Sequence, residues 1–231
     1  TGNGGVNRTT SGESIGYFYG YRQVGIYQST ADLGNMPAWS NSLPGDIAYA
    51  DLNGDGVITD ADRENLGSPF PDYNYGINVS LGYKKFDVVL EGQGVAGNYV
   101  YTQRRKSSTF ATLNYETNRL NAWTAPGTSN IEPVLDATRL NNNLMSTYFL
   151  EPGDYFRIRT VQLGYTFGEE SLNKIGVKSL RLFISGQNLK TWSKTTGYTP
   201  EAPLNDILGA GADNGVYPLP AIYTFGLRLT L

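Results

Sequence analysis

The stretch YNYGINVSLGYKKFDVVLEGQ, residues 73–93, decides the fold class. In its first half, apolar side chains alternate strictly with Asn, Gly and Ser, and only a β-strand turns a period of two into one apolar and one polar face. In its second half Phe86, Val88 and Leu90 form one face, and mostly charged or amide side chains form the other. Only the residues around Tyr83 separate the halves, so the stretch predicts a β-hairpin with a tight turn.

Two kinds of protein use such a hairpin. A soluble sandwich buries the apolar face against a second sheet, whereas a membrane barrel turns it to lipid, with aromatic side chains at both interfaces and polar groups inside. The apolar face of this hairpin is aromatic at its ends, and the chain holds 28 Gly and 17 Tyr. The hydrophobic fraction, 39%, is low for a self-contained core. These features favour the membrane barrel.

The composition excludes several functions. A formal charge of −3 over 231 residues indicates no nucleic-acid partner. The chain contains no cysteine and no histidine, which excludes disulfides, Ser-His catalysis and histidine metal sites within it. Its acidic residues form no recognisable glycosidase pair, so we expect no enzyme activity. The sequence contains no run of about 18 apolar residues, so it predicts no transmembrane helix.

Three further stretches alternate like the hairpin, at residues 155–167, 177–189 and 221–231. The connections between the five predicted strands are alternately short and long. Outer-membrane barrels have short periplasmic turns and long extracellular loops, whereas a sandwich has no reason to keep its long loops at one end. We therefore expect an extracellular loop region over residues 1–72, followed by barrel strands and their loops over residues 73–231.

Two arginines fall in the apolar register of the third predicted strand. Arg157 and Arg159 share the parity of Val161 and Leu163. A charged side chain on the lipid face costs about 2–4 kcal/mol at the bilayer midplane but little near the interface. The membrane-spanning part of this strand is therefore expected to begin after Arg159.

The sharpest local motif is DLNGDGVITDAD, residues 51–62. It places oxygen-bearing residues at positions 1, 3, 5, 7 and 12 of an EF-hand-type loop, with Gly56 at position 6 for the sharp turn. Position 12 is Asp, where calcium sensors use Glu. The alternative is an Asx-rich turn that caps a short helix over residues 60–65. The motif favours a structural calcium ion, and its predicted ligands are Asp51, Asn53, Asp55, Val57 and Asp62.

Substrate-binding residues cannot be chosen from the pattern. Aromatic rings stack on sugars, so Trp39, Tyr101, Trp123 and Trp192 are candidates by chemistry, although a Trp in a loop more often simply packs. The basic run at residues 104–106 is expected to be a solvated loop rather than an anion site.

Five blocks in order along the chain resemble a known family. They are IGYFYGYRQVGIYQ (15–28), PGDIAYADLNGDGVITDADRENLG (44–67), PDYNYGINVSLGYKKFDVVLEGQG (71–94), LRLFISGQNLKTW (180–192) and YPLPAIYTFGLRLTL (217–231). Together they resemble the C-terminal part of SusC/RagA-type TonB-linked outer-membrane transporters of Bacteroidetes. The chain departs from such barrels in its last residue, Leu231, because they usually end in an aromatic side chain.

The resemblance implies the C-terminal strands of a 22-stranded barrel whose plug and remaining strands lie upstream. It also implies a multi-pass location in the cell outer membrane and contact with outer-membrane lipid. TonB would act through the upstream part, a SusD-like surface lipoprotein would be the partner, and the cargo would be oligosaccharides or peptides. Residues 1–10 look like the middle of a loop, so we expect a piece of a longer protein. The competing hypothesis is a soluble all-β glycan-binding module with a dockerin-like calcium loop.

Overall fold

The computed structural model describes residues 6–107, 116–168, 172, 176–201 and 209–231. Its contacts divide the chain into two compact units, which we call the loop unit and the strand unit. The loop unit comprises Thr1–Phe70, Asn98–Pro152 and Glu201–Val216, and the strand unit comprises Pro71–Gly97, Gly153–Pro200 and Tyr217–Leu231.

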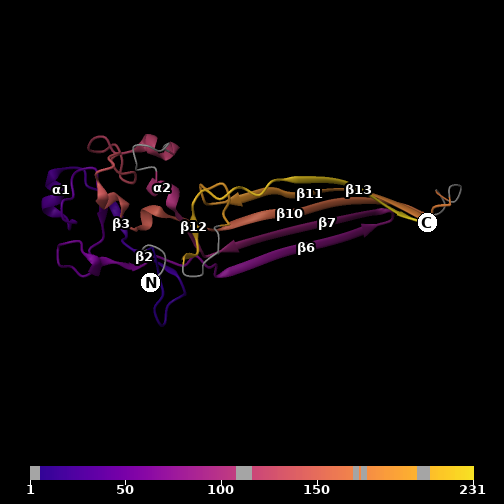
Figure 1. Ribbon diagram of the computed structural model, residues 1–231, viewed down its shortest axis with the longest axis horizontal. Helices are drawn as coiled ribbons and strands as arrows, with labels where there is room; N and C mark the ends of the chain where they lie inside the picture. The colour runs from indigo at the N-terminus through magenta and orange to yellow at the C-terminus, as the bar shows by residue number, and fades with distance from the viewer. Residues whose placement is uncertain (1–5, 108–115, 169–171, 173–175, 202–208) are drawn as a thin grey trace. The chain divides into compact units, whose positions relative to one another are not determined.

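The strand unit is one antiparallel sheet of five strands in the order β13-β11-β10-β7-β6 (Figure 1). All five strands predicted from the alternation are present. Tyr83 pairs with Phe86, and Lys84 has the positive φ, 54°, that a tight two-residue hairpin turn requires. The strands are β6 (Tyr73–Tyr83), β7 (Phe86–Ala96), β10 (Tyr155–Phe167), β11 (Ser179–Ser193) and β13 (Ile222–Thr230).

The register places the apolar side chains of all five strands on one face of the sheet. One row of directly opposed residues runs Leu81, Val88, Leu163, Ile184, Phe225 across it. We call this side the apolar face. Its members are Tyr73, Tyr75, Ile77, Val79, Leu81, Tyr83, Phe86, Val88, Leu90, Gly92, Gly94, Ala96, Phe156, Ile158, Val161, Leu163, Tyr165, Phe167, Leu180, Leu182, Ile184, Gly186, Lys190, Trp192, Tyr223, Phe225, Leu227 and Leu229.

No second layer of described protein covers the apolar face. Ile77 is 53% exposed, Leu163 43% and Leu227 63%, and Leu182 is half-buried. The centre of a soluble sandwich would be closed against another sheet about 10 Å away. The exposure of this face is therefore the pattern that the membrane-barrel prediction requires.

A β-bulge changes the predicted placement of two arginines. The register of β10 shifts at Arg159 against both β7 and β11, so residues before the shift change face relative to those after it. The Nε of Arg157 donates to Oγ1 of Thr191 at 2.9 Å, and Nη1 of Arg159 donates to Oε1 of Gln93 at 2.9 Å. Both arginines lie on the polar face, and their prediction on the apolar register was wrong.

The loop unit contains short strands in three sheets, of order β1-β2-β5, β12-β8-β9 and β3-β4. The strands are β1 (Asn7–Arg8), β2 (Tyr17–Gly20), β3 (Gln23–Ile26), β4 (Ile47–Tyr49), β5 (Glu64–Asn65), β8 (Tyr99–Thr102), β9 (Leu150–Pro152) and β12 (Ala212–Asp213). The helices are α1 (Thr30–Asn35), α2 (Gln103–Ser107) and the 3₁₀ turns η2 (Asp60–Asp62), η3 (Thr117–Asn121), η4 (Leu140–Asn143) and η5 (Thr147–Phe149). No helix within the described residues is long and apolar enough to cross a membrane.

An aromatic core holds the loop unit together, although the sequence shows little periodicity there. Its nine members lie between residues 18 and 149, and six of them are aromatic. Tyr21 contacts Tyr49, and Phe149 contacts both Tyr101 and Tyr148. The border near Phe70 lies close to the predicted boundary after residue 72. Within the two long connections, Asn98–Pro152 and Glu201–Val216 lie in the loop unit, and the flanking residues lie in the strand unit. The core residues are Phe18, Tyr21, Ile26, Ile47, Tyr49, Ile58, Tyr101, Tyr148 and Phe149.

The basic run at the start of α2 is part of this framework. Nε of Arg104 donates to Asp213 at 3.0 Å, and Nη2 of Arg105 donates to Glu151 at 2.7 Å. Both arginine side chains are largely buried, because each ties α2 to a strand of the β12-β8-β9 sheet. The prediction of a solvated loop was therefore wrong for these two residues.

Candidate functional site

An ion pair spans three strands on the polar face of the sheet. Nε of Arg181 on β11 donates to Oδ1 of Asp87 on β7 at 2.9 Å, and Nη2 of the same guanidinium bonds Oδ2. The pair passes over Gly164 of β10, where a Cβ atom would lie 2.6 Å from Nη2. The guanidinium also lies 5.1 Å from the ring centroid of Phe183. Glycine at position 164 is thus what allows opposite charges to meet across an intervening strand.

Further along the polar face, the strands form a shallow depression of about 490 Å³. Asn78, Glu91, Gln93 and Arg159 contribute to its lining. These groups offer hydrogen-bond donors, acceptors and both signs of charge. Such a surface can face water or a polar solute, and it would be costly against hydrocarbon.

The apolar face carries a band of aromatic rings at one end. Tyr75 and Phe156 stack with centroids 6.3 Å apart, and Phe156 and Trp192 stack at 6.1 Å. A Cβ on Gly92 would lie 2.7 Å from the Phe156 ring, and one on Gly94 would lie 2.5 Å from that of Tyr75. The two glycines therefore let the rings lie directly against the sheet.

A second aromatic band lies at the other end of the same face. The ring of Tyr165 is 4.8 Å from that of Phe86 and 4.7 Å from that of Phe167. Tyr83 follows Tyr75 by eight residues on β6, which is roughly 26 Å of extended strand. At a tilt of about 40° the two bands stand roughly 20 Å apart, close to the apolar height of about 25 Å that aromatic girdles flank in outer-membrane barrels.

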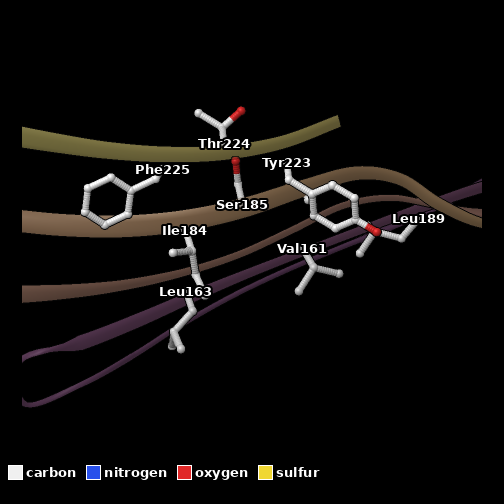
Figure 2. Close-up of a pocket in the computed structure, with 9 residues that line it drawn as sticks. Val161, Leu163, Ile184, Ser185, Leu189, Tyr223, Thr224 and Phe225 are labelled. Atoms are coloured by element: carbon white, nitrogen blue, oxygen red, sulfur yellow. The ribbon is translucent and has the colours of Figure 1, made fainter. Parts of the chain in front are cut away.

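A groove of about 480 Å³ interrupts the apolar face (Figure 2). Gly186 forms part of its lining, and a Cβ there would lie 2.6 Å from Cδ2 of Leu189. Leu189 reaches this position because β11 bulges at Asn188, whose φ is 52°. The other apolar walls are Val161, Leu163, Ile184, Tyr223 and Phe225. Thr224 also borders the groove, but Figure 2 shows its side chain on the opposite side from those of Leu163 and Ile184.

The predicted calcium loop is folded by its own side chains. Oδ1 of Asp51 accepts from the Gly54 N–H at 2.7 Å, and Oδ2 accepts from the Gly56 N–H at 2.9 Å. Asn53 Oδ1 accepts from the Asp55 N–H at 2.9 Å. Gly56 has a φ of 83°, which confirms why glycine is needed at the sixth position. These bonds hold the sharp turn that an EF-hand-type loop requires.

Asp62 behaves differently from the other predicted ligands. It is fully buried, and its carboxylate accepts from the N–H groups of Leu52 at 3.0 Å and Thr59 at 2.7 Å. Burial works to raise the pKa of Asp62, but these backbone hydrogen bonds hold the pKa below its ordinary value. With Thr59 as N-cap, Asp62 completes a capping box on η2. The alternative predicted a short helix over residues 60–65, whereas η2 ends at Asp62 and residues 64–65 form β5.

Within the described residues, no three His, Cys, Asp or Glu side chains are grouped so that they could hold a metal ion. The loop still contains the predicted donor types, since Asn53 and the Val57 carbonyl are oxygen ligands of another kind. Each carboxylate oxygen that accepts one N–H retains a further lone pair. The residues present are thus compatible with calcium, and the calcium site stays a prediction.

The four candidate substrate aromatics do not share a site. Trp39 packs edge-on against Tyr21 at 5.6 Å, Trp123 packs on the loop-unit core, and Tyr101 is a buried member of that core. Trp192 lies on the apolar face, away from the polar face. The Asp87–Arg181 pair was missed, although the alternation had placed both residues on the polar side of their strands.

Comparison with known proteins bears on the family. No protein-family model matches the chain. TonB-dependent receptor P3 of Formosa agariphila is 35% identical over 229 residues, covering 94% of this chain and 22% of that protein. TonB-dependent receptor SusC of Bacteroides thetaiotaomicron is 26% identical over 231 residues, covering 97% of this chain and 21% of that protein. The chain therefore spans about a fifth of the length of these relatives.

Solved structures agree on the fold. The structure of the RagAB peptide transporter matches with a TM-score of 0.70 and 18% identity over 93% of this chain and 23% of that chain. The RagAB peptide importer in its closed-closed state matches with a TM-score of 0.70 and 16% identity, covering 98% of this chain and 25% of that chain. The predicted fold class is confirmed: the mostly stranded chain matches part of a TonB-dependent transporter barrel.

The class of protein follows from the sequence relatives and the fold together. The chain is homologous to a segment of TonB-dependent receptors, and the predicted resemblance to the SusC/RagA type is confirmed. The relatives' names describe receptors and not enzymes. Nothing in these comparisons favours the soluble glycan-binding alternative.

Proposed function

We propose that this chain forms part of an outer-membrane, TonB-dependent importer. The observation that carries the proposal is the exposed apolar face with an aromatic band at each end, opposite a face of charged and amide groups. In a bilayer the apolar face contacts lipid, and the polar face lines the interior of the barrel that this chain completes with upstream strands. The protein is multi-pass, and its long connections lie outside the cell.

The proposed cargo is an oligosaccharide or a peptide. The similarity to a protein named SusC supports this class of importer, and a structural neighbour is described as a peptide transporter. A SusD-like surface lipoprotein is the proposed partner on the extracellular side. TonB, acting through the upstream plug, is the proposed source of energy. The polar face, with Glu91, Arg159 and the Asp87–Arg181 pair, offers hydrogen bonds to either type of cargo.

The importer proposal is tested on the full-length protein in its own cell. Membrane fractionation should recover it with the outer membrane, and its deletion should abolish uptake of one labelled pool, either oligosaccharides or peptides. Deletion of TonB should abolish the same uptake. Affinity purification should recover a SusD-like lipoprotein. Recovery of the full-length protein in a soluble fraction, or unchanged uptake of both pools in the deletion strain, would refute the proposal.

The loop at residues 51–62 is a second proposed site, for a structural calcium ion. Asp51, Asn53, Asp55 and the Val57 carbonyl would supply oxygen ligands, and Asp62 would add its carboxylate to its capping role. Calcium would stabilise a turn whose backbone hydrogen bonds are already in place. The ion would have no catalytic part.

Calorimetric titration of the detergent-solubilised full-length protein with calcium tests this site. Asp51→Ala and Asp55→Ala should each abolish the binding heat and speed proteolysis within the loop, while the barrel stays assembled. Asp72→Ala, which removes an exposed carboxylate outside the loop, is the matched control and should bind as the unmodified protein does. Absence of binding at millimolar calcium would reject the site.

A further inference from the structure

Lys190 is an exception on the apolar face. Within the described strands it is the only charged residue on that face, where it lies opposite Ile158 and two residues before Trp192. Its side chain is exposed, and no described residue forms a hydrogen bond or ion pair with its ammonium group. Near a membrane interface such a lysine destabilises the protein only slightly. It is stabilised most when its ammonium group contacts a negatively charged group there.

The apolar groove begins beside this lysine. Leu189, the preceding residue, forms one wall, and its side chain lies over Gly186, where a Cβ would be 2.6 Å from Cδ2 of Leu189. Trp192, on the other side of Lys190, belongs to the aromatic band that marks the interface. One continuous strip of β11 therefore offers an interfacial ring, a free cation and an apolar groove, in that order.

We propose that this strip binds one phosphorylated membrane lipid, with its phosphate at Lys190 and one acyl chain in the groove beside Gly186. The inference rests on the proposed function, because only a barrel in the membrane presents this face to lipid. An ammonium group is a compact charge that suits a phosphate oxygen. An acyl chain fits a groove whose walls on the apolar face are hydrocarbon and aromatic, while Ser185 and Thr224 border it from the other side. The order of the two parts along β11 matches the order of headgroup and chain from the interface inward.

The test is lipid retention by the full-length protein in nanodiscs, measured by native mass spectrometry after release. The probes are diphosphorylated lipid A and the same lipid after removal of its phosphates. The protein should retain the phosphorylated form preferentially. Lys190→Gln should lower its retention about fivefold, as expected for one lysine near a membrane surface, and should remove the preference. Lys178→Gln, which changes an exposed lysine directly before β11, is its control.

The groove has its own pair of variants. Val161→Phe should fill it and lower retention of both lipids, whereas Val79→Phe, in the same row of the sheet but outside the groove, should change neither. Equal retention of the two lipids by the unmodified protein, or equal effects of Lys190→Gln and Lys178→Gln, would overturn the phosphate assignment. Equal effects of Val161→Phe and Val79→Phe would overturn the groove assignment. Recovery of the protein outside the membrane would instead refute the proposed function.

Discussion

Replacing Val79 with arginine tests which face of the sheet meets lipid. Val79 lies on the apolar face of β6, 37% exposed, and midway between Tyr75 and Tyr83 of the two aromatic bands. Four residues of strand separate it from each ring, roughly 13 Å, which places it near the middle of the apolar height. Arginine at that depth costs about 2–4 kcal/mol. The folding equilibrium should therefore shift about 30- to 700-fold toward the unfolded state.

Urea unfolding of the full-length protein in lipid vesicles, followed by tryptophan fluorescence and by gel mobility, measures this shift. The control is Ser80→Arg, one residue along β6 and on the polar face, which should stay close to the unmodified protein. Should Ser80→Arg cost as much as Val79→Arg or more, the assignment of faces would be wrong. Little loss from either variant would place both faces in water.

Three further predictions concern single side chains. Gly164→Ala should break the Asp87–Arg181 pair, because its Cβ would lie 2.6 Å from Nη2, and should cost about 1 kcal/mol in the same urea assay. Asp62 should stabilise the loop unit fully above about pH 5 and lose this as the pH falls below 3.8, because its pKa is lowered; Asp62→Asn should flatten that dependence in circular dichroism. Burial and the charge of Asp46 raise the pKa of Tyr27 to about 12, so its contribution should be complete below pH 10 and be lost as the pH rises toward 12. Tyr27→Phe should reduce the alkaline loss of stability in thermal melts, and the other buried tyrosines with raised pKa values should account for the remainder.

The strand unit could be predicted because its sequence obeys one rule over long stretches. β6 and β13 alternate for nine residues or more, and β10 alternates over its eight residues after the bulge, so each has one apolar and one polar face. A period of two then determines both the strand and the orientation of every side chain. The alternately short and long connections were consistent with a simple up-and-down topology. In the structure each of the five strands pairs with the strand that precedes or follows it among the five along the chain.

The bulge at Arg159 shows where that rule fails. An alternating pattern does not show where one extra residue is inserted into a strand. The prediction therefore continued the alternation of Val161 back to Arg157 and placed Arg157 on the apolar face. The structure restores both arginines to the polar face. The two arginines in an otherwise apolar register were the available sign of a β-bulge. A bulge that moves them to the other face costs less free energy than a charged side chain in lipid.

The loop unit lay beyond sequence reasoning for a different reason. Its strands are two to four residues long, too short for a period to show. Its core brings together residues as far apart in the sequence as Phe18 and Phe149. Contacts between such residues produce no pattern in the sequence near either of them. The turn at residues 51–62 could be predicted because its residues interact with one another within a short stretch. The positions of Trp39 and Trp123 could not be predicted, because they pack against residues far away in the sequence.

The loop unit is assembled from three separated lengths of chain, and this affects when it can form. The side chain of Asp213 bonds Arg104 across 109 positions in the sequence, and β12 supplies an outer strand to β8 from the same late segment. Contacts of such span close slowly, because a long stretch of chain must be ordered before they gain anything. The members of the aromatic core all lie between residues 18 and 149, so the core can form before residue 213 joins it. The bond from Arg104 to Asp213 and the pairing of β12 with β8 are therefore expected to complete the loop unit last.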